Sequence, residues 1–583
     1  MSFGMNNGYT RGVRFQRQGI SPDETFTYLG KGDPGGKAAG LATIKHTITT
    51  HFPEGRFGEI RVTIPRMTVL LTGIFEDFLL DNKLDFKTLR MLEDEQIALH
   101  FQKAELPAYI VGDLYSLISS AHEPLAVRSS SLLEDALHQP LAGVYETKMI
   151  PNNQPEAETR FRKLVEAIKF VYASTYFRAA RDYFQAVGRD VGEERMAVII
   201  QEVVGYPFGR RYYPTLSGVA RSYNYYPTGG ARPEDGFVGL ALGLGKTIVD
   251  GGKVWCYSPS RPQAPPPYST PQEILKNSQT DFWAVSMSAP KEYDPIRETE
   301  YLEHADLRQA GADGTLRYVC SSYDPAADRL VMGESGPGAR LVDFSPILKA
   351  KTIPLNDLIT RLLEISETNL KSSVEIEFAL SFDPDRGREP RFGFLQVRPV
   401  VISLEGSEVD LAELDPDRVV AICRTTMGHG VRDGLRHVVY VKPDSFDSSS
   451  TSVIARELEG INDGLLREGA TYVLIGFGRW GSSDPWLGIP VNWSQISAAR
   501  VIVETTLPEM NPDLSQGSHF FHNITNLGIL YFSVQESHGD RIDWEWLSRQ
   551  PVKDESKYVR HVVSETNLKA AANGRQGEGV ILR

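Results

Sequence analysis

The segment VEIEF carries two acids, and the segment FLQVRPV carries an amide and an arginine at the same spacing. Glu375 and Glu377 are two residues apart, and so are Gln396 and Arg398. Because side chains alternate across a strand, each pair is expected on one face of a hairpin whose strands are joined by DPDRGREP. Paired carboxylates suit Mg²⁺ carried on nucleotide phosphates, and an arginine beside them can stabilise charge on a phosphoryl group during transfer. The alternative is a surface hairpin with cross-strand salt bridges.

A glycine-rich segment near the N-terminus, GDPGGKAAGL, ends in a lysine. Gly35 and Gly36 permit close approach of the backbone to a ligand, and Lys37 places a point charge at the start of a helix. The segment does not match the phosphate-binding pattern G-x-x-x-x-G-K-[ST]. A helix-start turn with a solvated lysine is therefore the more ordinary interpretation of this segment taken alone.

An arginine closes the apolar run in LAVRSSS. Arg128 can bind phosphate oxygens through both arms of its guanidinium, with the following serine hydroxyls as support. The alternative is a salt bridge from Arg128 to Glu134 or Asp135.

Two further segments can contact a nucleotide. In MAVIIQEVV, Gln201 can read the edge of an adenine or simply end a strand. In GLALGLGKTIV, the glycines permit close backbone approach and Lys246 follows them, although a loop between strands explains the pattern equally well.

Patterning divides the chain into an arm, a large first domain, a linker and a second domain. The ranges are 1–27 for the arm, 28–404 for the first domain with halves of about 28–195 and 196–404, 405–417 for the acidic linker, and 418–583 for the C-terminal domain. Within the first domain, the stretch 259–350 is rich in Pro, Ser and Asp and gives no clear pattern.

The composition is that of an ordinary globular protein of several domains. The chain has 583 residues, 23% of them charged, and a net charge of −13, so we expect no nucleic-acid partner. The 3 cysteines fit no metal or disulfide pattern, and no apolar run is long enough to cross a bilayer. We therefore expect a cytoplasmic protein with no membrane partner. The sequence is compatible with a homo-oligomer as well as with a monomer.

In their order along the chain, these segments resemble the N-terminal ATP-binding domain of the phosphoenolpyruvate synthase and pyruvate phosphate dikinase family. The most specific parts are AVRSS with LAGVYET, and EIEF with LQVRP. The resemblance covers residues 28–402 and implies an ATP-grasp-like fold. The expected fold class is α+β, with this nucleotide-binding domain followed by a separate mixed α/β domain.

The resemblance also implies a ligand and individual roles, with ATP and Mg²⁺ as cofactors. Lys37 and Arg128 would hold ATP phosphates, and Gln201 would lie near the adenine. Glu375 and Glu377 would hold Mg²⁺. Gln396 and Arg398 would be catalytic at the transferring phosphate.

The sequence departs from the family in two respects. We find no GG-x-T-x-H motif for the phosphohistidine domain and no phosphoenolpyruvate-binding barrel, so we do not expect phosphoenolpyruvate synthase activity from this chain alone. Lys246 follows GLG where synthase-type members usually carry an acid. This lysine can bind an anion, replace a metal contact, or mark an altered or lost transfer step.

The C-terminal domain carries two histidines in SQGSHFFHN. His519 and His522 are three residues apart and would share a helix face, which suits a metal ion or a phosphoryl acceptor. Core or capping histidines explain the spacing equally well, and His429 is the next candidate acceptor.

Two functional hypotheses follow. The first is an ATP- and Mg²⁺-dependent phosphotransferase of the dikinase type, which passes a phosphoryl group to a protein histidine or to an unknown small molecule. The second is a catalytically altered nucleotide-binding protein with a regulatory or scaffolding role.

Overall fold

The structure is a computed structural model. It describes residues 12–17, 25–52, 55–134, 143–186, 189–225, 227, 231–264, 270–290, 292–400, 415–482, 484, 486–506, 529–535, 539–574 and 576–583.

The described chain forms two compact units. The larger comprises Met1–Ser222, Phe237–Thr247 and Lys253–Val400, and the smaller comprises Tyr223–Gly236, Ile248–Gly252 and Val401–Arg583. Both contain helices and sheets, and the predicted α+β class is confirmed.

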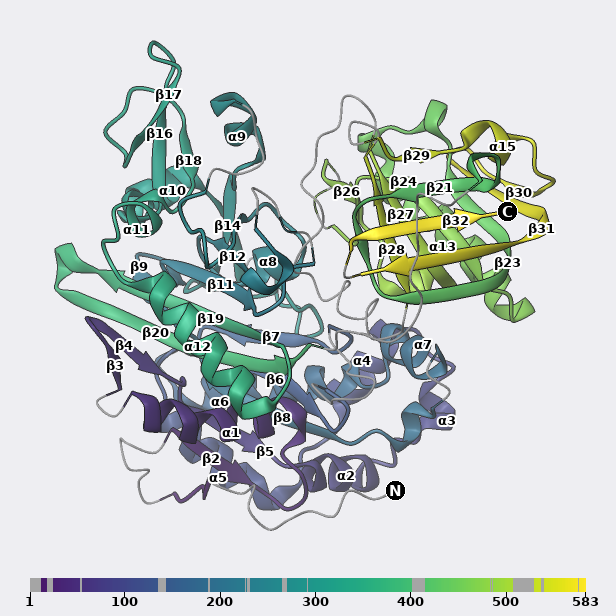
Figure 1. The fold of residues 1–583 in the computed structure, drawn as a ribbon. Coiled ribbons are helices and arrows are strands. Elements are labelled where there is room, and N and C mark those ends of the chain that lie inside the picture. The colour runs from purple at the N-terminus through teal and green to yellow at the C-terminus, as the bar shows by residue number, and fades with distance from the viewer. Residues whose placement is uncertain are drawn as a thin grey trace. The chain divides into compact units, whose positions relative to one another are not determined.

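A six-stranded sheet carries the N-terminal half of the larger unit (Figure 1). Its order is β1 (Val13–Arg14), β2 (Phe26–Leu29), β5 (Met67–Leu70), β8 (Met196–Glu202), β6 (Leu125–Ser131) and β7 (Thr147–Ile150). Strand β1 lies within the range that we predicted as an N-terminal arm. The helices of this half are α1 (Gly35–His51), α2 (Thr72–Asp81), α3 (Phe86–Leu89), α4 (Asp94–Lys103), α5 (Ala108–Ser120), α6 (Ala157–Ser174) and α7 (Arg178–Ala186).

A seven-stranded sheet carries the second half. Its order is β13 (Trp255–Tyr257), β12 (Phe237–Ala241), β11 (Leu216–Arg221), β19 (Val374–Asp383), β20 (Arg388–Pro399), β4 (Ile60–Thr63) and β3 (Arg56–Phe57). Helix α12 (Leu355–Leu370) packs on β19, and its buried leucines join the core cluster that holds Ile376 and Phe378. The opposite face of β19 is therefore the one that carries Glu375 and Glu377.

The described residues of the stretch 259–350 form short helices and strands of two small sheets, one of which also takes two strands from residues 206–213. The sheets are β15 (Leu302–Asp306), β14 (Asp281–Ser286), β10 (Arg211–Tyr213) and β9 (Tyr206–Phe208), and β17 (Arg329–Met332), β16 (Cys320–Asp324) and β18 (Arg340–Val342). The helices are α9 (Pro271–Asn277), α10 (Leu307–Asp313) and α11 (Ser345–Leu348), and α8 (Lys246–Val249) precedes them.

The smaller unit is built on a ten-stranded mixed sheet. Strands β23 (Gly430–Val441), β24 (Tyr472–Phe477), β27 (Ala499–Thr505) and β28 (Leu530–Val534) are parallel neighbours. The other strands are β21 (Val419–Cys423), β22 (Thr426–Met427), β29 (Arg541–Ile542), β30 (Val552–Glu555), β31 (Val559–Asn573) and β32 (Glu578–Leu582), with a separate pair β25 (Arg479–Trp480) and β26 (Gly488–Ile489). Its helices in the described ranges are α13 (Thr451–Glu468) and α15 (Trp544–Ser548).

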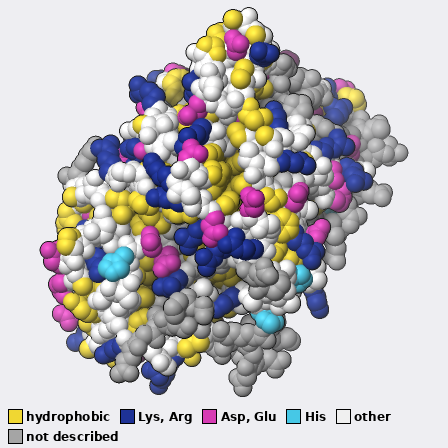
Figure 2. Space-filling view, turned by 90° about the vertical axis from the view of Figure 1, so that its left-hand side faces the viewer, with side chains coloured by type: hydrophobic (Ala, Val, Ile, Leu, Met, Phe, Trp, Pro, Cys, Tyr) yellow, Lys and Arg dark blue, Asp and Glu magenta, His cyan; other side chains and the backbone are white. Residues whose placement is uncertain are grey.

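The surface carries charges of both signs. Figure 2 shows acidic and basic side chains interspersed with apolar ones on the face in view. Of the helices in the described ranges, none has the length and apolar character needed to cross a membrane.

The first helix begins against the strand that carries Arg128. Ser130 Oγ accepts a hydrogen bond from Ala38 N at 3.1 Å and donates one to Pro34 O at 2.8 Å. Gly35 has a φ of +74°, and a Cβ there would lie 1.7 Å from Ser130 O. Only glycine tolerates both the backbone conformation and this close approach.

Replacing Gly35 with alanine should therefore be severely destabilising. The left-handed backbone and the clash together predict a loss of roughly 2–5 kcal/mol in the free energy of unfolding, measured by urea denaturation. Gly387→Ala is the matched control, because Gly387 has a φ of +66° and nothing within 4 Å of its Cβ position. It should lose only about 1–2 kcal/mol, and equal losses in the two variants would contradict the role of the Ser130 contact.

Candidate nucleotide site

The predicted hairpin is present, and its register brings the polar residues face to face. Glu375 pairs with Arg398, and Glu377 pairs with Gln396, on the antiparallel strands β19 and β20. The register shifts between Glu377 and Phe378, so that Leu395 is the extra residue of a β-bulge.

The bulge changes which side chains of β20 enter the core. Beyond it, Phe394 pairs with Phe378, and both rings are buried in the main core. Val397 is also buried in this core, whereas the side chain of Leu395 is only half-buried. Ile376, Phe378 and Val397 therefore lie on the core face of the hairpin, whereas Leu395 does not join the core because of the bulge.

Glu375 is held between two arginines. Its two carboxylate oxygens accept hydrogen bonds from Arg221 Nε and Arg398 Nη2. All three residues are buried, with Glu375 only 1% exposed. Arg221 was not among the predicted residues. The available signal was the apolar strand segment LSGVAR, which ends in a cation just as LAVR does.

Arg128 joins the two sheets. On β6 it shares a face with Gln201 on β8, and its Nη1 donates to Gln201 Oε1 at 3.3 Å. The same nitrogen donates to the carbonyl of Leu395 at 3.1 Å, and Nη2 donates to Gln396 Oε1 at 2.7 Å. Nη2 also lies 3.5 Å from Glu377 Oε2. Four of the predicted site residues thus meet at one point.

The alternative salt bridge from Arg128 to Glu134 is wrong, because Glu134 binds a different cation. Its Oε1 accepts from Lys37 Nζ at 2.7 Å and from Ser129 Oγ at 2.9 Å, and its Oε2 accepts from Ser131 N at 2.8 Å. Lys37 is buried, so the alternative of a solvated lysine is also wrong. Asp135 lies outside the described residues.

Lys246 begins α8, which follows strand β12 of the second sheet, and it has an acidic partner. Its Nζ is 2.9 Å from Glu298 Oε2, in the segment between β14 and β15. That segment is anchored by Lys148, which is buried, pairs with Glu300 at 2.8 Å and donates to the carbonyl of Pro295 at 2.8 Å. Glu298 lies in the stretch that showed no clear sequence pattern.

The candidate phosphoryl acceptors come from the C-terminal part of the chain. His519 and His522 lie outside the described residues. His429 lies between β22 and β23 in the smaller unit and is half-buried. In the described ranges, no group of three His, Cys, Asp or Glu side chains is placed to hold a metal ion.

The fit of a Mg²⁺ ion to the two predicted acids is unequal. Both oxygens of Glu375 already bind guanidinium groups. Glu377 lies beside Arg128 with 16% of its side chain exposed. Mg²⁺ is usually held by one or two carboxylates together with phosphate oxygens, so Glu377 fits this role and Glu375 does not fit it in this arrangement.

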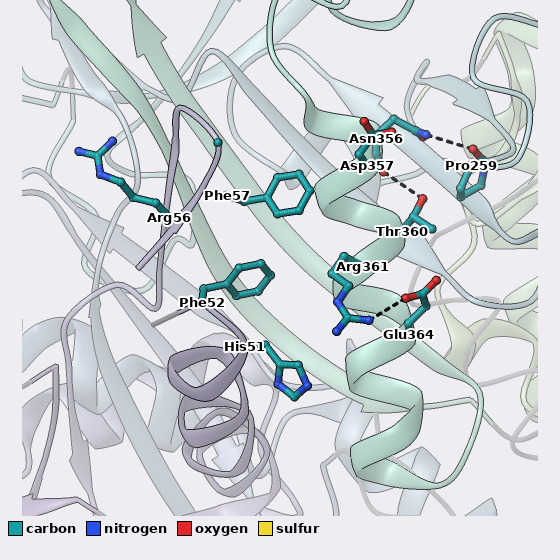
Figure 3. A pocket seen from close by; sticks show the side chains of 11 residues that line it. His51, Phe52, Arg56, Phe57, Pro259, Asn356, Asp357, Thr360, Arg361 and Glu364 are labelled. Atoms are coloured by element: carbon teal, nitrogen blue, oxygen red, sulfur yellow. Dashed lines mark hydrogen bonds and ion pairs between the residues drawn. The ribbon is translucent and has the colours of Figure 1, made fainter. Parts of the chain in front are cut away.

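Two surface hollows lie away from these residues. One, of about 670 Å³, is lined by the end of α1, by β3 and by α12, with Phe52 and Phe57 packed edge to face beside Arg361 and Glu364 (Figure 3). The other, of about 380 Å³, lies near Arg388 at the far end of the hairpin. Neither is lined by a predicted site residue.

One family model matches the part of the chain that carries these residues. The profile of the family described as pyruvate phosphate dikinase, AMP/ATP-binding domain, matches residues 33–417. The chain belongs to this family. ATP binding by the matched domain follows, and the resemblance deduced from the sequence is confirmed. No individual curated protein matches the chain. The roles of single residues in this dikinase-family domain stay predictions.

The buried Lys37–Glu134 pair should be important for stability. Lys37→Met leaves the Glu134 carboxylate buried without its cation, which predicts a loss of about 3–5 kcal/mol in the free energy of unfolding, measured by urea denaturation. Arg56→Met is the control, because Arg56 pairs with Glu389 at the exposed surface. It should lose less than about 1 kcal/mol, and a comparable loss in both would refute the assignment.

A second buried acid gives this region a pH dependence. Burial raises the pKa of Glu194 from 4.5 to about 7, and the charge of nearby Glu134 adds to the rise. The folded state therefore binds this proton more tightly than the unfolded state. The associated stability is fully present below pH 4.5 and is lost as the pH rises through 7.

Glu194→Gln should remove this loss. The variant should become more stable than wild type as the pH rises from 5 to 8, by up to about 3 kcal/mol, measured as unfolding free energies across that range. Glu193→Gln changes the exposed neighbouring acid and should not alter the pH profile. A constant difference between Glu194→Gln and wild type at all pH values would contradict the expectation.

Proposed function

We propose that this chain is an ATP- and Mg²⁺-dependent phosphotransferase of the dikinase type. One phosphoryl group of ATP passes to an acceptor and a second passes to water, so the products are AMP, phosphate and a phosphorylated acceptor. The acceptor is a protein histidine or an unknown small molecule. The observation that carries the proposal is the meeting of Arg128, Gln201, Glu377 and Gln396 at one point within a domain that binds AMP or ATP.

The cations of the site are suited to holding a polyphosphate. Lys37 and Arg128 come from the first sheet and its helix, and Arg398 comes from the hairpin of the second. Charge-assisted hydrogen bonds from such groups to phosphate oxygens are stronger than neutral ones. Because burial excludes water, they also stabilise the charge that develops on a transferring phosphoryl group.

Gln201 and Gln396 would orient the nucleotide. Gln201 Nε2 is buried and donates to no described residue, so it is available to an acceptor on the adenine ring. Gln396 is positioned by Arg128, and its amide lies beside Glu377 in the register of the hairpin. Glu377 would hold Mg²⁺, which would neutralise part of the negative charge on the phosphates.

A second candidate function is a nucleotide-binding regulatory or scaffolding protein. It is favoured by Lys246, which forms an ion pair with Glu298 where synthase-type members of the family usually carry an acid. Such a protein would bind ATP without releasing AMP.

The products of ATP turnover test the two functions. Purified protein incubated with Mg²⁺ and ATP should release AMP and phosphate, resolved by ³¹P NMR, and labelled phosphate should appear on protein if a histidine is the acceptor. Arg398→Ala and Glu377→Gln should each lower the rate by about 10²–10³-fold, the usual effect of removing one charge-stabilising group.

Arg391→Ala is the control, since Arg391 is an exposed arginine of the same strand, and its rate should match wild type. Release of ADP alone would refute the dikinase chemistry. Turnover by both site variants at the wild-type rate would refute the site. Binding of ATP without turnover would favour the second candidate.

A further inference from the structure

Arg221, Glu375 and Arg398 form one row across three neighbouring strands. Arg221 on β11 pairs with Glu375 on β19, which pairs with Arg398 on β20. Directly paired residues of antiparallel strands project from the same face, so both guanidinium groups lie on the face that carries Glu377.

The row is buried and positively charged. Arg221 and Arg398 are 6% and 2% exposed, and a single carboxylate lies between them. Two cations with one anion give the triad a net charge of about +1 at neutral pH.

Arg221 keeps donors for such a ligand. Its Nε is used by Glu375, and its guanidinium carbon lies 5.8 Å from the centre of the Phe237 ring. Its two terminal nitrogens donate to no residue in the part of the chain that the structure describes. A guanidinium fixed at Nε and by an aromatic ring presents these nitrogens in a defined orientation, which suits the oxygens of a phosphate.

The row lies next to the predicted phosphate and metal residues. Glu377 and Gln396 form the adjacent row of the same face, two residues along each strand, or about 6.6 Å away. One extended polyphosphate can therefore contact both rows at once.

Glu375 cannot serve the triad and a metal ion together in this arrangement. Each of its oxygens accepts from a guanidinium group, and coordination of Mg²⁺ would require an oxygen to exchange a charge-assisted hydrogen bond for the metal. Loss of those bonds would release two buried arginines from their common partner, which is strongly unfavourable.

We propose that Arg221 is a further phosphate-binding residue for the polyphosphate end of the nucleotide, next to Arg398, and that Glu375 is the positioning residue that holds both guanidinium groups. The metal contact then belongs to Glu377 alone among the two acids. This inference rests on the proposed site for ATP but not on its turnover.

Binding measurements test it without catalysis. Calorimetric titration with the non-hydrolysable analogue AMP-PNP and with AMP, both in the presence of Mg²⁺, compares wild type with Arg221→Ala. Loss of one charged contact predicts affinity for AMP-PNP about 10- to 100-fold lower and affinity for AMP nearly unchanged. Arg221→Lys should recover part of the loss, and Arg391→Ala should bind as wild type does.

The metal assignment is tested by titrating Mn²⁺ into the AMP-PNP complex and following free Mn²⁺ by electron paramagnetic resonance. Glu377→Gln should weaken Mn²⁺ binding, while Glu375→Gln at saturating AMP-PNP should stay near wild type. Glu375→Asp serves as the second variant if Glu375→Gln does not fold.

Three outcomes overturn the proposal. They are equal AMP-PNP affinity in Arg221→Ala and wild type, equal loss of Mn²⁺ affinity in the Glu375 and Glu377 variants, and absence of nucleotide binding by wild type. Binding with these differences but without turnover leaves the inference standing and refutes only the proposed phosphotransferase activity.

Discussion

The site depends on the hydrogen bonds of Arg128, because they connect two separate sheets. Its guanidinium contacts Gln201 on its own sheet, and Gln396 and the Leu395 carbonyl on the hairpin of the other. A phosphate oxygen that binds Nη1 or Nη2 of Arg128 would compete with these acceptors. Occupancy of the site and contact between the two sheets are therefore energetically linked.

The β-bulge explains how one strand can serve both the core and the site. Without an extra residue, Phe394 and Gln396 would project from the same face of β20. The insertion of Leu395 lets Phe394 enter the core while Gln396 faces Glu377. It also displaces the Leu395 carbonyl from the regular ladder, and that carbonyl accepts from Arg128. The local irregularity is thus part of the site's construction.

The sequence was sufficient to predict the hairpin, its polar face and the helix start at Lys37, because these depend on local spacing. It was not sufficient to identify partners contributed by distant segments. Glu298 comes from a stretch with no clear periodicity, and its pairing with Lys246 spans 52 residues. Arg221 is 154 residues from Glu375, and its importance becomes visible only when β11 is placed beside β19. Pairings of this kind are set by tertiary packing, which local patterns do not encode.

The charged side chains discussed above form ion pairs with one another in the absence of a ligand. Five cations have an acidic partner within the same unit: Lys37 with Glu134, Arg128 with Glu377, Lys246 with Glu298, and Arg221 and Arg398 with Glu375. Each acid weakens the attraction of the site for an anion but fixes the direction in which its cation points. Fixed donors need little reorganisation when charge develops on a phosphoryl group, as the proposed transfer would require. A site selected only for affinity would gain from leaving its cations uncompensated.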